Sequence, residues 1–334
     1  MDLLDRLRLD VPVAQAGMGG GVAGPRLAGA VAAAGGLGTL GLLPPRALPA
    51  AVGEVRERAP GRSVAVNLLM PFVRAGHVEA CVRAQVDVAV LFFGGDARLV
   101  DRLRDAGVFV LIQVGTLVQA RRAVGWGADG LIAQGWEAGG HLLGVHPALD
   151  YLPRVLAVAD GRPVLLAGGI ATATDTRTAL DAGAAAVVAG TRFLLTTESA
   201  AHPEYQRRVL EADRTLETTL FGFGWPARHR VVPNLATDHW CHADGRPRRT
   251  PRLINASSGA LARLLPDQAT AVLPRLQRRW LPVLTPAPVL AGMPTSTVDS
   301  APLYAGESAR RITTIVPARQ ALDELAGRDA AYGS

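Results

Sequence analysis

Residues 163–193, PVLLAGGIATATDTRTALDAGAAAVVAGTRF, carry the pattern on which the fold prediction rests. The stretch opens with one short apolar run, PVLLA, and closes near a second, AAVVA. Between them lies a segment with helical spacing that ends at Gly183. Continuous apolar runs are typical of parallel strands covered by helices. The stretch therefore predicts a strand, a crossover helix and a second strand parallel to the first.

The same unit recurs along the N-terminal part of the chain. The eight apolar runs begin at Val11, Leu37, Val64, Val88, Val108, Gly130, Pro163 and Ala185. Most are separated by segments with helical periodicity. Eight strand–helix units that close on themselves form an α/β fold of the (β/α)8 type, a TIM barrel. An open, doubly wound sheet is the alternative that this pattern leaves.

The strand–helix pattern stops after the eighth predicted strand. We expect residues 1–212 to form the barrel, with residues 202–212 as its eighth helix or an extension of it. Residues 213–284 are expected to form a smaller, mainly helical second domain over the C-terminal mouth of the barrel. Residues 285–334 are expected to return to the barrel.

Three later segments also have helical spacing. Residues 257–267 and 270–280 predict two amphipathic helices in the smaller domain. Residues 316–327 predict a last helix, which we expect on the barrel wall.

Composition excludes nucleic acid as a partner. The 334 residues are 49% hydrophobic and carry a net charge of +6, and every basic residue is Arg. A nucleic-acid surface gathers basic residues on one face, interleaved with aromatic side chains. Here the arginines are dispersed and aromatic residues make up 5% of the chain. We therefore expect a small-molecule substrate.

The chain predicts a cytoplasmic protein without a membrane segment. No uncharged run of 18 apolar residues occurs, and the first residues lack the apolar core of a signal peptide. Two cysteines, Cys81 and Cys241, do not make a disulfide framework. Residues 238–242, DHWCH, contain metal-ligand residue types but lack a second group at zinc spacing, so no metal site is predicted.

Two glycine-containing loops follow the last two predicted strands. Gly168 and Gly169 end the seventh strand, and Gly190 and Thr191 end the eighth. In barrels of this type, the loops after strands seven and eight often bind a phosphate through backbone N–H groups. The two loops predict such a phosphate site.

Another glycine pattern, GGGVAG at residues 19–24, matches the phosphate loop of dinucleotide-binding folds. Those folds also need an acidic residue about 20 residues further on, which binds the ribose. The next acidic residue here is Glu54. We therefore interpret the glycines as a loop at the end of the first strand, and the dinucleotide fold as the less favoured alternative.

Polar side chains end several of the predicted strands. They are Gln15, Asn67, Gln113, Gln134 and, behind a glycine pair, His141. Buried carboxamides need hydrogen-bond partners. Several of them beside a phosphate site favour an aromatic heterocycle that carries carbonyl groups and ring nitrogens. Flavin mononucleotide (FMN) meets that description.

With these motifs, the chain resembles a known family, the nitronate monooxygenases, which were formerly grouped as 2-nitropropane dioxygenase-like proteins. The resemblance covers nearly the whole chain. The segments that carry it are PVAQAGMGGGV, AAAGGLGTLG, VAVNLLMP, GLIAQGWEAGGH, PVLLAGGIA, AGTRFLLTTESAAHPEYQ and YAGES. Flavin-dependent enoyl-acyl-carrier-protein reductases share most of these motifs and remain the alternative.

The resemblance implies roles for individual residues. Asn67 and Gln134 resemble ligands of the flavin ring, with Gly17 and Met18 behind it, and Gly139 resembles a glycine that approaches the flavin closely. The residues that resemble the phosphate cradle are Gly168, Gly169, Ala189, Gly190 and Thr191. The family's usual Ala-Pro-Met in the first loop is Ala16-Gly17-Met18 here.

The resemblance also implies the reaction. His141 matches the histidine that faces the substrate, where an imidazole can take a proton next to a nitro group or stabilise a nitronate. The implied enzyme is an FMN-dependent monooxygenase that converts a nitronate or nitroalkane and O2 to a carbonyl compound and nitrite. A homodimer is compatible with the resemblance. The enoyl reductase alternative would take hydride from NAD(P)H.

Overall fold

The computed structural model describes residues 2–264 and 277–328. The chain forms two compact units. The first comprises Met1–Ala138, Leu143–Ala200 and Thr314–Ser334, and the second comprises Gly139–Leu142 and Ala201–Thr313. The second unit thus begins earlier in the chain than residue 213, and the domain boundaries expected from the sequence stay a prediction.

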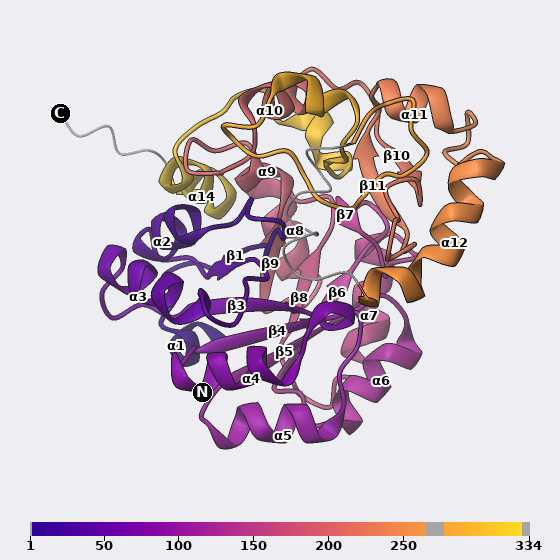
Figure 1. Ribbon diagram of the computed structural model, residues 1–334. Helices are drawn as coiled ribbons and strands as arrows, with labels where there is room; N and C mark the ends of the chain where they lie inside the picture. The colour runs from indigo at the N-terminus through magenta and orange to yellow at the C-terminus, as the bar shows by residue number, and fades with distance from the viewer. Residues whose placement is uncertain (1, 265–276, 329–334) are drawn as a thin grey trace. The chain divides into compact units, whose positions relative to one another are not determined.

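The first unit is built on an eight-stranded parallel sheet (Figure 1). Its strands are β1 (Val13–Gln15), β2 (Gly38–Leu40), β3 (Val64–Leu69), β4 (Val88–Phe92), β5 (Phe109–Val114), β6 (Gly130–Gln134), β8 (Val164–Ala167) and β9 (Ala186–Ala189). The order is β1-β9-β8-β6-β5-β4-β3-β2. A parallel bridge between Ala14 and Leu37 joins the two ends of this order. The sheet is therefore a closed (β/α)8 barrel, as predicted, and not an open sheet.

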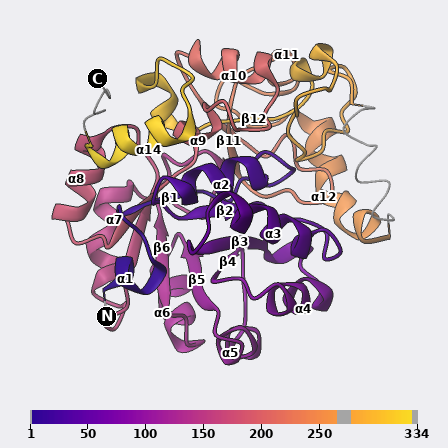
Figure 2. The same ribbon diagram turned by 90° about the vertical axis from the view of Figure 1, so that its left-hand side faces the viewer.

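Helices cover the outside of this barrel (Figure 2). They are α2 (Pro25–Ala33), α3 (Leu48–Arg58), α4 (Ala75–Arg83), α5 (Ala97–Asp105), α6 (Leu117–Gly125), α7 (Ala148–Leu156), α8 (Ala173–Asp181) and α14 (Ala318–Ala326). Shorter elements are α1 (Leu3–Leu7), α9 (Thr191–Leu194) and a 3-10 turn, η1 (Met70–Phe72). Among the described residues no helix is long and apolar enough to cross a membrane.

Two apolar layers stabilise the barrel, because side chains alternate between the two faces of each strand. Val88, Val90 and Leu111 belong to a cluster inside the barrel, which Leu3 and Leu7 of α1 also join. Residues such as Ala89 and Val110 face outward and pack with the surrounding helices. Both faces of the strands are buried, which explains the continuous apolar runs in the sequence.

The eighth helix of the barrel wall is α14, not residues 202–212. α14 packs against α2 and α8, and its Ala321 and Leu322 are fully buried. Arg192 on α9 donates to the carbonyl oxygen of Thr314 at 2.8 Å and thereby fixes the chain just before α14. Residues 316–327, which were expected to form a last helix, contain α14. Residues 202–212 instead contain α10 (Pro203–Leu210), which belongs to the second unit.

The second unit combines helices with a small antiparallel sheet that the sequence did not predict. Its strands are β7 (Gly140–His141), β10 (Leu216–Thr218), β11 (His229–Val232) and β12 (Leu303–Tyr304), and β11 pairs with the other three. Its helical elements are α10, α11 (Leu235–Trp240), α12 (Arg249–Leu264), η2 (Thr295–Asp299) and η3 (Glu307–Arg311). The helix predicted over 257–267 falls largely within α12, whereas most of 270–280 lies outside the described residues.

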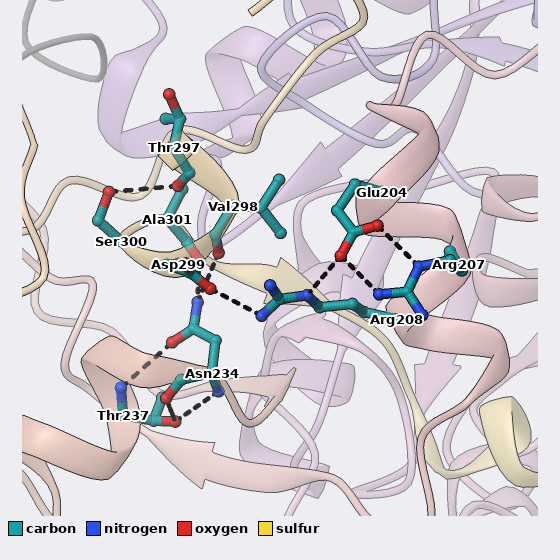
Figure 3. A network of polar contacts seen from close by, with 10 residues as sticks. All are labelled: Glu204, Arg207, Arg208, Asn234, Thr237, Thr297, Val298, Asp299, Ser300 and Ala301. Carbon is teal, nitrogen blue, oxygen red and sulfur yellow. Dashed lines mark hydrogen bonds and ion pairs between the residues drawn. The ribbon is translucent and has the colours of Figure 1, made fainter. Parts of the chain in front are cut away.

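A network of polar contacts joins α10 and α11 to η2 (Figure 3). The side-chain nitrogen of Asn234, the residue that caps α11, donates to the carbonyl oxygens of Val298 and Ala301 at 2.9 and 2.8 Å. Arg208 of α10 forms an ion pair of 2.8 Å with Asp299. These contacts link three segments that are distant in the chain.

Candidate functional site

Three carboxamides point into the barrel of the first unit near the C-terminal ends of its strands. They are Asn67 on β3, Gln113 on β5 and Gln134 on β6. The residues two positions earlier, Ala65, Leu111 and Ile132, all belong to the cluster inside the barrel. Because side chains alternate along a strand, the three carboxamides face the same interior. Polar residues therefore replace the apolar core at the end of the barrel where such enzymes bind their ligands.

Asn67 lies against the loop that follows β1. It is 7% exposed, and its side-chain nitrogen donates to the carbonyl oxygen of Gly17 at 3.1 Å. A Cβ atom added to Gly17 would lie 2.3 Å from the Cβ atom of Asn67, so this approach requires glycine at position 17. The next residue, Met18, is partly buried against the outer apolar layer. The structure thus brings Gly17 against Asn67, with Met18 as the next residue of the same loop.

Gln134 shapes the loop after β6. Its side-chain oxygen accepts hydrogen bonds from the backbone N–H groups of Leu143 and Gly144, at 2.7 and 3.3 Å. The side chain is 3% exposed. These two bonds fix the orientation of the Gln134 carboxamide.

The two glycine loops also lie at the C-terminal ends of strands. Gly168 and Gly169 follow β8 with φ of +115° and +75°, a left-handed conformation that favours glycine. Gly190 directly precedes α9, and Thr191 is 6% exposed at its first position. Ala189 faces the outer apolar layer, so it can offer only backbone atoms to a ligand. β8 and β9 are adjacent in the sheet, which brings the two loops to neighbouring positions.

Gln15 has a structural role that the sequence did not reveal. Its side chain is 1% exposed, and its oxygen accepts a hydrogen bond of 3.0 Å from the backbone N–H of Thr39. It thereby adds a contact between β1 and β2, where the barrel closes. The burial of this carboxamide is explained without a ligand.

His141 lies on β7 in the second unit, within a group of aromatic rings. Its imidazole stacks on Trp225 with a centroid distance of 4.0 Å and an interplanar angle of 24°. His229 and Tyr304 lie at centroid distances of 5.2 and 5.4 Å. Burial, and then the proximity of His229, lower the pKa of His141 well below its ordinary value. The imidazole is therefore neutral at pH 7.

His229 is the functional candidate that the sequence analysis missed. It lies opposite His141 in the β7–β11 pair and is fully buried. Its Nδ1 lies 2.9 Å from the carbonyl oxygen of Ala227, which can only accept, so this nitrogen carries the proton. Burial lowers the pKa of His229 to about 4, although the hydrogen bond to Ala227 opposes the shift.

Contacts within the second unit leave no room for a side chain at position 139. A Cβ atom added there would lie 2.4 Å from the backbone nitrogen of Gly306 and 2.5 Å from the carbonyl carbon of Ala305. Ala305 and Gly306 therefore pass directly against Gly139, the residue before β7. This contact alone accounts for the glycine, and an approach of Gly139 to a flavin stays a prediction.

Within residues 2–264 and 277–328, no group of three or more His, Cys, Asp or Glu side chains is placed to hold a metal ion. Cys81 and Cys241 are both buried free thiols.

The first unit has the arrangement of a barrel enzyme, in which ligand-binding residues gather at the C-terminal ends of the strands. The family model for nitronate monooxygenase matches residues 47–327. The chain therefore belongs to the nitronate monooxygenase family.

Similar proteins carry several different names. One relative, from Mycobacterium tuberculosis, is a (3aS,4S,5R,7aS)-5-hydroxy-7a-methyl-1-oxo-octahydro-1H-indene-4-carboxyl-CoA dehydrogenase, 40% identical over 69% of this chain and 65% of its own length. A protein of the same name from Rhodococcus jostii is 36% identical, and the match covers 62% of its length. The matches thus span less than two thirds of both relatives.

Solved structures extend the likeness to nearly the whole chain. FabK from Thermotoga maritima is 26% identical with a TM-score of 0.77, and the match covers 98% of this chain and 94% of that one. The nitroalkane oxidase from Streptomyces ansochromogenes is 27% identical with a TM-score of 0.76, covering 98% and 97%.

Proposed function

We propose that the protein is an FMN-dependent nitronate monooxygenase, which oxidises alkyl nitronates or nitroalkanes with O2 to a carbonyl compound and nitrite. The observation that carries the proposal is the set of Asn67, Gln113 and Gln134, which face one barrel interior beside the glycine loops after β8 and β9. Membership of the nitronate monooxygenase family supports the same activity.

The residues in the barrel fit FMN. Gly168 and Gly169 carry no side chains of their own, so the backbone N–H groups of this loop can approach a phosphate. Gly190 and Thr191 would complete this phosphate cradle, together with the backbone of Ala189. The side-chain nitrogen of Asn67 is bound to the carbonyl oxygen of Gly17, so a bond to the flavin would come from its Oδ1 atom, which suits a flavin ring nitrogen as donor.

The bound flavin would accept electrons from the substrate and pass them to O2. His141 is the proposed base. A neutral imidazole can take the proton from the carbon next to a nitro group, and general-base assistance of this kind is worth about 10²–10⁴-fold in rate. Because the pKa of His141 is lowered, its imidazole would stabilise a nitronate as a neutral hydrogen-bond donor rather than as a cation.

The test is to record the visible spectrum of the purified protein and to mix the protein without oxygen with ethylnitronate or with NADPH. Loss of the long-wavelength flavin band with ethylnitronate but not with NADPH is the expected result. His141→Asn should then lower the rate with a nitroalkane by about 10²–10⁴-fold while the flavin stays bound. Absence of a flavin spectrum, or reduction by NADPH alone, would refute the proposal.

A second candidate is the oxidation or reduction of an acyl thioester. The relative from M. tuberculosis that is named for a carboxyl-CoA substrate is 40% identical to this chain, which favours a thioester as the second substrate class. The enoyl reductase that the motifs left open belongs to this class. Rapid bleaching of the flavin by NADPH, followed by reoxidation with an enoyl thioester, would select this function.

A further inference from the structure

Glu137 is a carboxylate at the C-terminal end of the barrel that the proposed function does not use. It lies in the loop after β6 and is half-buried within the first unit. Both of its carboxylate oxygens accept from the backbone N–H of Ala148, the first residue of α7, at 3.0 Å. In the described parts of the chain this N–H is the only donor that reaches the carboxylate. An ionised carboxylate can accept several hydrogen bonds, so acceptor positions are left for a ligand.

The loop itself fixes the position of this carboxylate. A Cβ atom added to Gly135 would lie 2.3 Å from Oε2 of Glu137 and 2.5 Å from the Cβ atom of Ala148. The Glu137 side chain therefore folds back over Gly135 onto the start of α7. Pro147, the residue before α7, forms no side-chain hydrogen bond to the helix, and Glu137 caps it instead. The partial positive charge of the helix N-terminus favours a carboxylate there.

The same carboxylate borders the glycine loop after β8. Oε2 of Glu137 lies 3.5 Å from the position of a Cβ atom added to Gly168, and the Cβ atom of Glu137 lies 3.9 Å from that of one added to Gly169. Gln134 at the end of β6 pairs with Ala167 at the end of β8, so the two loops begin side by side. Glu137 thus lies near both the carboxamide proposed for the flavin ring and the loop proposed for the phosphate.

The chemistry of FMN decides which of its parts suits this place. A phosphate is an anion that a neighbouring carboxylate would repel. Since β8 lies between β6 and β9, the phosphate can bind on the β9 side of the glycine loop, at Gly190 and Thr191. The ribityl chain joins the ring to the phosphate and carries hydroxyl groups, which donate hydrogen bonds to carboxylates. A carboxylate on the β6 side therefore suits the ribityl chain.

We propose that Glu137 is a flavin-binding residue, whose carboxylate accepts a hydrogen bond from a hydroxyl group of the ribityl chain of FMN. Such a bond is of the stronger kind, because its acceptor is charged. The bond from Ala148 holds the carboxylate in place before the flavin binds, so little side-chain freedom is lost on binding. The inference rests on the proposed function in taking FMN as the cofactor.

The test is flavin binding to the full-length protein after its own flavin has been removed, measured by flavin fluorescence. The probes are FMN and its 2′-, 3′- and 4′-deoxy analogues, which each lack one ribityl hydroxyl and keep the ring and the phosphate. Glu137→Ala should bind FMN about 10–100-fold more weakly than the wild type, as expected for the loss of one hydrogen bond to a charged group. One deoxy analogue should bind to the wild type with a similar loss. Glu137→Ala should bind that analogue as tightly as it binds FMN.

Three further variants separate this bond from the capping of α7. Pro147→Ser, added to Glu137→Ala, supplies a local capping hydroxyl and should restore stability in urea unfolding but not the affinity for FMN. Glu137→Gln keeps a neutral acceptor oxygen, so its loss of FMN affinity should be smaller than that of Glu137→Ala. Asp150→Ala removes an exposed acidic side chain from the first turn of the same helix and should leave FMN binding unchanged.

Two results would overturn the inference. In the first, all three deoxy analogues bind to the wild type as tightly as FMN, a result that decides even when Glu137→Ala does not fold. In the second, Pro147→Ser restores the FMN affinity of Glu137→Ala, which would mean that the carboxylate acts only through α7. A wild type that binds no FMN would refute the proposed function as well. Absence of nitronate turnover would refute the proposed function alone, because the binding measurement needs no substrate.

Discussion

At the scale of single residues, Gly17 is the position where a methyl group matters most for the proposed flavin site. Gly17→Ala would bring a Cβ atom to 2.3 Å from that of Asn67, so Asn67 must move. We expect about 1–3 kcal/mol of destabilisation, as for other overpacked sites, together with a loss of bound flavin. Urea unfolding and the ratio of flavin to protein absorbance measure the two effects.

Gly19→Ala is the matched control, because a Cβ atom added at Gly19 would meet nothing within 4 Å beyond the neighbouring residues in the chain. It lies in the same loop and should leave both stability and flavin content close to those of the wild type. Equal stability and flavin content of Gly17→Ala and Gly19→Ala would show that the position of Asn67 does not matter for either property.

The spacing of the carboxamides was predictable from the sequence, because a strand repeats every two residues. The side chains of Asn67 and Gln134 point into the barrel because the residues two positions earlier do so. The local sequence was therefore enough to predict their orientation. The pairing of His141 with His229 was not predictable. It depends on an antiparallel register between β7, which has only two residues, and a strand far along the chain.

At the scale of elements, Asn234 is the residue that ties α11 to η2. Asn234→Ala removes the cap of α11 and leaves the buried carbonyls of Val298 and Ala301 without their donor. We expect a loss of about 2–4 kcal/mol of stability. Asn234→Ser keeps a capping oxygen and should recover about 1 kcal/mol of that loss in urea unfolding. Equal unfolding free energies of the two variants would show that the capping hydrogen bond does not contribute to stability.

Glu204 on α10 should make the stability of the protein depend on pH. Hydrogen bonds from Arg207, and then from Arg208, lower the pKa of Glu204 from 4.5 to about 2. A lowered pKa means that the ionised carboxylate stabilises the folded state fully above pH 4.5, and that this contribution is lost as the pH falls toward 2.

The thermal midpoint of the wild type should therefore exceed that of Glu204→Gln at pH 7, and the gap should narrow between pH 4.5 and pH 2. Because Arg207 is exposed, added salt should also narrow the gap. Differential scanning calorimetry across this range checks both effects. A gap that stays constant with pH would contradict the assignment to Glu204.

The exchange of α10 for α14 shows what helical periodicity leaves undetermined. Residues 202–212 and 316–327 both have an apolar face, and the pattern alone does not say which surface covers that face. In α10 the buried Tyr205 donates its hydroxyl hydrogen to the carbonyl oxygen of Tyr304, within the second unit. In α14 the buried residues face α2 and α8. Which surface covers each helix depends on tertiary contacts, which cannot be inferred from the local sequence of the helix.

At the scale of the whole molecule, a barrel is stable only when its ring of strands and its wall of helices are both complete. The strands close through Ala14 and Leu37, near the start of the chain. The wall closes through α14, near its end. Folding of the first unit therefore depends on residues from both ends of the chain, separated in sequence by the whole second unit.

This dependence predicts that one substitution in α14 weakens the entire barrel. Leu322 is fully buried, and its Cδ1 atom would lie 2.7 Å from a Cβ atom added at Gly36, which precedes β2. Leu322→Ala should cost about 2–5 kcal/mol of unfolding free energy. Gln320→Ala, on the exposed face of the same helix, should change it by less than about 0.5 kcal/mol. In Leu322→Ala, the amides of β1 and β9 as well as those of α14 should lose protection from hydrogen exchange. A loss of protection confined to α14 would mean that this helix opens on its own and that the barrel is stable without it.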